Sequence, residues 1–214
     1  MKKAFTLAET LITLGIIGVV AAITIPGLVT KYRANKLRTQ LQKANAIIQQ
    51  ATMRMKADEL NIDETVNKGD YQTIQSYFKN GGCKIPTSAN NANYKNYLGK
   101  FPTAHAADSQ LLSPYCLFDG MILWIGQINT PRHSLFAIDI NGWKNKPDRY
   151  GQDVFFWVYN PDTQTLVPLG ENDYIKNGFK TYYSKCPGAE TAEMGIACTD
   201  KALNDKSYFE KLPK

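Results

Sequence analysis

An almost unbroken apolar run near the N-terminus limits what this chain can become more than any other feature. Between Phe5 and Val29 only Glu9 carries a charged side chain, and Lys2 and Lys3 precede the run. A helix needs roughly 20 apolar residues to cross the hydrocarbon layer of a bilayer. The segment therefore predicts a membrane-spanning helix or an export signal.

Glu9 lies near the start of this segment, and a carboxylate there needs an explanation. Acids within membrane spans are rare and usually paired or functional, because a charge in hydrocarbon costs about 2.5–3.5 kcal/mol on insertion scales. One interpretation is that Glu9 reaches the headgroups. The other is that a cation from a second chain neutralises it. Cleavage between Ala4 and Phe5 would create such a cation, since an α-amine has a pKa of about 7.7–8.0.

These residues resemble the N-terminal signal of type IV pilins and type II secretion pseudopilins. The resemblance covers about 30 residues. It rests on the basic leader before Phe5, on Glu9, and on a long apolar helix that contains Gly15, Gly18 and Pro26. It implies a structural subunit of a pilus or of a secretion pseudopilus, and the sequence does not choose between the two.

The resemblance also implies a processing site, an assembly site and partners. A prepilin peptidase would cut between Ala4 and Phe5 and N-methylate Phe5, although the family usually has glycine where this chain has Ala4. Glu9, Gly18 and Pro26 would belong to the assembly helix. The subunit would cross the bacterial inner membrane once, with a cytoplasmic N-terminus. It would then join copies of itself or other pilins, through an inner-membrane assembly platform, in a periplasmic or cell-surface filament.

Two features of the sequence favour other interpretations. Small residues up to Ala22 could form a site for ordinary signal peptidase, which would release a soluble secreted binding protein that starts at Ile23. Basic residues also follow the apolar run, at Lys31, Arg33 and Lys36 among others. The positive-inside rule counts such residues and favours the opposite orientation in the membrane.

Composition sets further limits. The formal net charge of +6 is modest for 214 residues, so we do not expect nucleic acid as a partner. Four cysteines that follow an export segment predict disulfides, and four cysteines allow three pairings. Many pilins have a disulfide-closed loop near the C-terminus. The resemblance therefore favours Cys186 with Cys198, which leaves Cys83 with Cys116.

The expected fold is α+β, with a long N-terminal helix packed on a small antiparallel sheet. We expect a leader at 1–4, a membrane or filament-core helix at 5–29, its amphipathic continuation at 30–60 and a head at 61–214. Apolar residues recur at helical spacing in the continuation, which predicts one buried face. They are Leu37, Leu41, Ala44, Ile48, Ala51 and Met55.

Within the head, four apolar runs predict strands, at 121–128, 134–140, 153–159 and 165–169. A short helix is expected at 72–78. Residues 83–115 contain many turn formers and predict an irregular loop. The chain from Gly170 onward predicts a loop-rich tail that includes the second cysteine pair.

One stretch of the head is rich in oxygen ligands. Asp139, Asn141, Asp148 and Asp153 lie within fifteen residues of one another, and such a set suits Ca²⁺. The stretch lacks the EF-hand pattern. The alternative is a rigid loop between two strands, in which these side chains accept hydrogen bonds from the backbone.

No pattern of catalytic residues is present, so we do not expect an enzyme. His105 and His133 have no nucleophile or acid at motif spacing, and no GxSxG, P-loop or HExxH sequence occurs. We expect both histidines to lie at surface or loop positions. We expect the three tryptophans to be core or edge residues of the sheet rather than a ligand-stacking surface. They are Trp124, Trp143 and Trp157.

Overall fold

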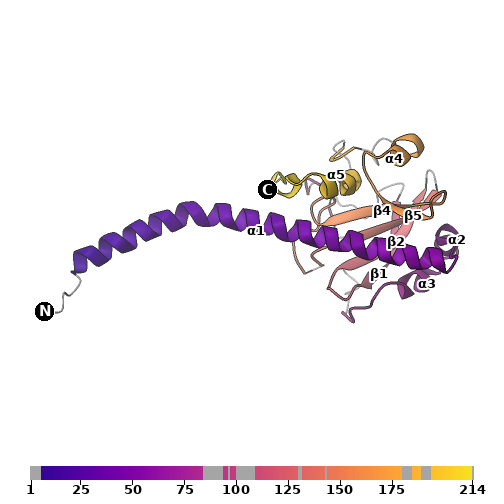
Figure 1. Ribbon diagram of the computed structural model, residues 1–214, viewed down its shortest axis with the longest axis horizontal. Coiled ribbons are helices and arrows are strands. Elements are labelled where there is room, and N and C mark those ends of the chain that lie inside the picture. The colour runs from indigo at the N-terminus through magenta and orange to yellow at the C-terminus, as the bar shows by residue number, and fades with distance from the viewer. Residues whose placement is uncertain are drawn as a thin grey trace. The chain divides into compact units, whose positions relative to one another are not determined.

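The computed structural model describes residues 6–83, 94–95, 97–99, 109–129, 132–142, 144–179, 185–188 and 194–213. The chain forms two compact units, residues 1–36 and 37–214. The elements in order (Figure 1) are α1 (Leu7–Ala57), α2 (Ile62–Asn67), α3 (Tyr71–Ser76), β1 (Ser109–Cys116), β2 (Ile122–Asn129), β3 (Arg132–Asp139), β4 (Val154–Asn160), β5 (Thr165–Pro168), α4 (Asp173–Gly178), η4 (Ile196–Cys198), α5 (Thr199–Asn204) and η5 (Tyr208–Glu210).

The long N-terminal helix is confirmed: α1 is one helix of 51 residues. It continues through Pro26, although a proline removes one backbone hydrogen bond from a helix. Its C-terminal end is a Schellman motif, in which the Leu60 N–H donates to the Met55 carbonyl at 2.9 Å and the Glu59 N–H to the Lys56 carbonyl at 3.1 Å. Glu59 takes the left-handed conformation that this motif requires, with φ of 54°.

The second half of α1 lies on the sheet (Figure 1). The predicted apolar face is buried from Leu41 onward, with exposed fractions of 0% for Leu41, Ala44, Ile48, Ala51 and Met55, whereas Leu37 is half-buried. Two hydrogen bonds join the helix to the last two strands. The Gln49 amide donates to the Leu166 carbonyl, and the Trp157 indole N–H donates to the Asn45 side chain, each at 3.0 Å. This confirms that the amphipathic half of the helix docks on the chain's own head.

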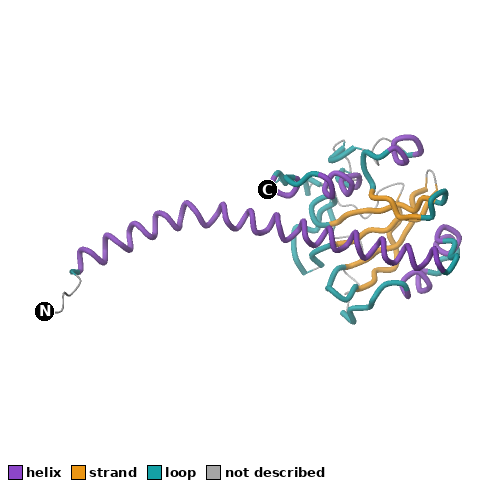
Figure 2. The backbone as a smooth tube through the Cα atoms, in the orientation of Figure 1, coloured by secondary structure: helices purple, strands orange, loops and turns teal. Residues whose placement is uncertain are grey.

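The strands form one sheet (Figure 2), whose order is β1-β2-β3-β4-β5 and in which every neighbouring pair is antiparallel. Each strand therefore pairs with the next one in the sequence. The four predicted strands correspond to β2 through β5. The prediction of an irregular loop over 83–115 is wrong for β1, which occupies Ser109–Cys116, so the sheet begins before residue 121.

Proline explains why β1 does not look like a strand in the sequence. Pro114 lies inside it, where the pairing with β2 is shifted between Leu112 and Tyr115. Proline cannot donate a ladder hydrogen bond, so in sheets it is confined to edge strands, strand starts and bulges. β1 is an edge strand, and the opposite edge strand, β5, ends at Pro168. A proline at each edge also hinders the pairing of either edge with another chain.

Both faces of the sheet are covered, since every residue of β4 is buried. On the face opposite α1, the C-terminal segment contributes Ile196 and Ala197 to a core that includes Phe156. The Phe156 N–H donates to the Thr199 hydroxyl at 2.7 Å, which attaches α5 to β4. The segment after Gly170 therefore contains α4 and α5 as well as the predicted loops.

Two disulfides connect the cysteines. Cys83 bonds Cys116 across 33 residues, and Cys186 bonds Cys198 across 12. This is the pairing that the resemblance favoured. Cys198 is fully buried against the sheet, so the second disulfide holds the C-terminal loop to the core.

Candidate functional site

The start of α1 contains a hydrogen-bond arrangement that the sequence analysis overlooked. The Glu9 carboxylate accepts from the Thr6 N–H at 2.8 Å and from the Thr6 hydroxyl at 2.9 Å, and both bonds go to Oε2. The Thr6 hydroxyl in turn accepts from the Glu9 N–H at 3.3 Å. This is a capping box, with the Thr-x-x-Glu spacing that the motif requires. Glu9 therefore has a role inside its own chain that needs no second copy.

The first half of α1 exposes large apolar side chains on every side. Exposed fractions run from 79% at Leu7 to 40% at Val29. The helix contains an 18-residue window with a mean hydropathy of 2.3, none of which is buried. Soluble proteins rarely expose contiguous apolar surface of this size. This part of the helix suits a membrane anchor or a signal sequence.

Two of the remaining residues of the predicted processing and assembly sites, Gly18 and Pro26, lie in the described part of α1. Ala4 and Phe5 lie outside the described residues. Gly18 is on the exposed surface of α1, and a Cβ there would meet no atom of the described chain within 4 Å. Pro26 is inside the helix, and its carbonyl accepts a hydrogen bond from the Thr30 hydroxyl at 2.9 Å. Nothing in the described part of the chain therefore requires Gly18 to be small.

A second group of predicted site residues gathers where β3 ends. Asp139 is the last residue of β3 and is fully buried. Its Oδ1 accepts from the backbone N–H groups of Asn141 at 3.1 Å and Gly142 at 2.8 Å. Its Oδ2 accepts from the Tyr94 hydroxyl at 2.8 Å. Both carboxyl oxygens of Asp139 are therefore hydrogen-bonded within the chain.

Asp153 closes the other side of the same loop and is also fully buried. It accepts from the backbone N–H groups of Asp148 at 2.8 Å and Arg149 at 2.7 Å, and from the Asn141 amide at 3.1 Å. Asp148 is 3% exposed and pairs through Oδ2 with the Lys146 ammonium. Its other oxygen, Oδ1, is buried without a hydrogen-bond partner among the described residues.

The two buried carboxyls have raised pKa values. Burial raises the pKa of Asp139 to about 8, and the nearby Asp153 charge adds to the increase. Burial also raises the pKa of Asp153 to about 6, against the hydrogen bonds from the Arg149 and Asp148 backbone, which lower it. Asp139 therefore holds a proton at neutral pH, and a cation at this loop would have to displace it.

The structure brings together the four residues of the predicted calcium site, as shown by their shared hydrogen bonds. Three of their seven side-chain oxygens, Oδ1 of Asp139 and both oxygens of Asp153, accept from backbone N–H groups, as the alternative interpretation of a rigid loop predicts. Oδ1 of Asn141 and Oδ1 of Asp148 are buried without a hydrogen-bond partner among the described residues. Among the residues that the structure describes, no three acidic, histidine or cysteine side chains converge in a way that could hold a metal ion. Calcium binding and a rigid loop without calcium stay the two alternatives for this stretch.

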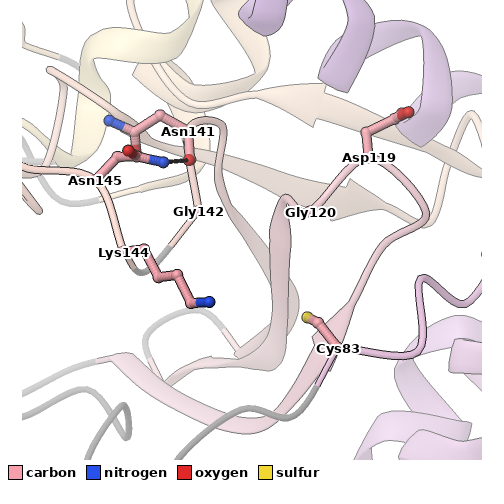
Figure 3. A pocket seen from close by; sticks show the side chains of 7 residues that line it. All are labelled: Cys83, Asp119, Gly120, Asn141, Gly142, Lys144 and Asn145. Atoms are coloured by element: carbon pink, nitrogen blue, oxygen red, sulfur yellow. Dashed lines mark hydrogen bonds between the residues drawn. The ribbon is translucent and has the colours of Figure 1, made fainter.

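A pocket lies beside this loop (Figure 3). It is lined by Cys83, Asp119, Gly120, Asn141, Gly142, Lys144 and Asn145. In Figure 3 the Lys144 ammonium and the Cys83 sulfur point toward the same open space, whereas the Asp119 side chain points away from it. Asp119 instead pairs with Lys43 of α1 at 2.9 Å. The Asn145 amide donates to the Asn141 carbonyl at 2.6 Å, which holds the rim of the pocket in place.

His133 is not the isolated surface residue that the sequence predicted. It lies on β3, and its Nδ1 is 3.1 Å from Oδ2 of Asp63 on α2. The other oxygen of Asp63 accepts from the Ser134 N–H at 2.7 Å and from its hydroxyl at 2.6 Å. A serine hydrolase needs its histidine against the serine hydroxyl, whereas here Asp63 contacts that hydroxyl. The group therefore attaches α2 to β3, and Phe179 packs against the histidine ring with centroids 5.6 Å apart.

The remaining aromatic residues named from the sequence are the three tryptophans and His105. Trp124 and Trp157 are buried, in agreement with the prediction of core residues. Trp143 and His105 lie outside the described residues.

No family model matches the chain, and no curated protein or solved structure matches it.

Proposed function

We propose that this chain is a structural subunit of a filament of the type IV pilus or type II secretion pseudopilus kind. It crosses the bacterial inner membrane once before assembly and polymerises through the first half of α1. One observation carries the proposal. A single helix changes along its length from apolar and exposed to amphipathic and buried on its own head. The apolar half therefore needs lipid while the subunit waits and other copies once it is assembled.

Glu9 gives this polymerisation its register. In the capping box its Oε2 takes both hydrogen bonds from Thr6, and Oε1 accepts none among the described residues. Oε1 is therefore available to a cation from a second copy. Cleavage before Phe5 would supply that cation as an α-amine, and methylation keeps its charge. Removal of one partner from a buried ion pair costs about 3–5 kcal/mol, so wrongly aligned copies would be strongly disfavoured.

The capping box makes a sharp test of this role possible, because glutamine can replace glutamate in the motif. Glu9→Gln keeps the cap and removes the charge, whereas Thr6→Ala weakens the cap and keeps the charge. We expect Glu9→Gln and Glu9→Ala to abolish incorporation into sheared surface filaments seen by electron microscopy. We expect Thr6→Ala to retain most of it. All variants should still lose their leader, as measured by the intact mass of the membrane fraction.

The opposite pattern would refute the assembly role. If Glu9→Gln forms filaments at the wild-type yield while Thr6→Ala does not, Glu9 acts only as a helix cap. The same mass measurement distinguishes a filament subunit from the alternative, a secreted binding protein. A filament subunit starts at Phe5, whereas a product of ordinary signal peptidase starts at Ile23.

A further inference from the structure

We propose that a basic collar on α1 binds the headgroups of anionic phospholipids at the outer boundary of the bilayer. The basic collar consists of Lys31, Tyr32, Arg33 and Lys36, which directly follow the apolar half of the helix. All four side chains are exposed, and Tyr32 has an exposed fraction of 67%. The proposal rests on the membrane-anchored subunit proposed above, and it adds a second partner for the waiting subunit.

The depth of the collar follows from helix geometry. Glu9 and Lys31 are separated by about 33 Å along a helix that rises 1.5 Å per residue. The hydrocarbon layer of a bilayer is about 30 Å thick. When Glu9 lies at one boundary of this layer, Lys31 therefore lies at the other. Tyrosine is enriched at this level of membrane proteins, because its ring is apolar and its hydroxyl is polar, and Tyr32 occupies that position.

The cations of the collar have no neutralising partner in their own helix. Between Glu9 and Asp58 the sequence contains no acidic residue, so no pair between adjacent turns of α1 is available. Within the described part of the chain, no ion pair involves Lys31, Arg33 or Lys36. Among the described residues these cations are therefore left to solvent ions or to a partner outside the chain.

Basic residues further along α1 differ from the collar in this respect. Lys43 pairs with Asp119 at 2.9 Å. Arg54 and Lys56 donate to backbone carbonyls of the head. These cations serve the packing of the helix on its own domain. The cations of the collar lie next to the apolar half of the helix and make no such contact among the described residues.

The placement of the cations around the helix favours lipid over a protein partner. Successive residues are turned by about 100°, so Arg33 points about 200° and Lys36 about 140° away from Lys31. The cations thus project to opposite sides of the helix. A protein surface would neutralise one side, whereas phosphate headgroups surround a membrane helix completely. Each basic residue near an anionic leaflet should strengthen binding about fivefold, and the three together about a hundredfold.

Native mass spectrometry of the full-length chain in a nonionic detergent tests this proposal. Dioleoylphosphatidylglycerol would be titrated against dioleoylphosphatidylcholine with the wild type, with Lys31→Gln/Arg33→Gln/Lys36→Gln, and with a control of equal charge change. Lys201→Gln/Lys206→Gln/Lys211→Gln is that control, because these three lysines are exposed on the head. We expect the wild type and the control to retain phosphatidylglycerol in preference to phosphatidylcholine. The collar variant should lose that preference at least tenfold, and added salt should weaken it in the wild type.

Two results would overturn the proposal. One is equal retention of phosphatidylglycerol by the collar variant and the wild type. The other is an unchanged lipid preference together with weaker self-association of the collar variant, which would assign the collar to a second copy of the chain. The Glu9 variants test the filament function separately, so failure of lipid binding and failure of that function give different results.

Discussion

Asp139→Asn should flatten the dependence of the head's stability on pH. Asp139 is fully buried, and burial raises the pKa of its carboxyl to about 8. Asparagine has nearly the same shape. Its oxygen can accept from the Asn141 and Gly142 N–H groups, and its amide can donate to the Tyr94 hydroxyl. The substitution therefore removes the titrating group and keeps the hydrogen bonds.

The direction and the size of this pH dependence of stability follow from proton linkage. An aspartate in the unfolded chain has a pKa of about 3.9. Between this value and about 8 the folded chain holds a proton on Asp139 that the unfolded chain has released. The stability from this group is thus fully present below the unfolded pKa and is lost as the pH rises through the folded pKa. Each pH unit lowers the unfolding free energy by a little over 1 kcal/mol per such group. The wild type should lose on the order of 3 kcal/mol between about pH 5.5 and 8.

Urea unfolding at several pH values, followed by fluorescence of the buried Trp124 and Trp157, measures this free energy. The full chain in a nonionic detergent is the sample. Between about pH 6.5 and 8, above the pKa of about 6 of Asp153, we expect the Asp139→Asn slope to be close to zero. Asp119→Asn is the control, because Asp119 lies at the surface against Lys43, and it should keep the wild-type slope. Equal slopes for Asp139→Asn and the wild type would refute the reasoning.

Two further predictions concern the head. Asp63→Ala leaves the Ser134 N–H buried without an acceptor, so it should lower the unfolding free energy by about 1–3 kcal/mol in the same assay. Asp63→Asn should lower this free energy less. An alanine variant whose unfolding free energy is within about 0.5 kcal/mol of the wild type would contradict the prediction. Because the carboxyl oxygens of Asp139 and Asp153 accept hydrogen bonds within the chain, we expect 1 mM calcium to shift the melting temperature by less than about 1 °C. A rise of about 5 °C or more that disappears in Asp148→Asn would instead establish a calcium site.

Regular spacing made much of the fold predictable. The apolar positions of α1 recur at helical intervals, and such a pattern has one consistent interpretation over several turns. Four of the five strands are short apolar runs between turn formers. β1 escaped prediction because Pro114 interrupts its pattern, and only the edge position of the strand in the folded sheet makes a proline acceptable there.

The sequence by itself determined the features that depend on neighbouring residues: the apolar span, the lone Glu9, and the run of cations without acids after it. The contact of Asp63 with His133 and the burial of Asp139 and Asp153 were decided by the tertiary structure alone. Asp63 and His133 are 70 residues apart, and no local pattern links them. The pKa of a carboxyl depends on how much water surrounds it. That property exists only once the strands and the C-terminal segment have closed around the loop.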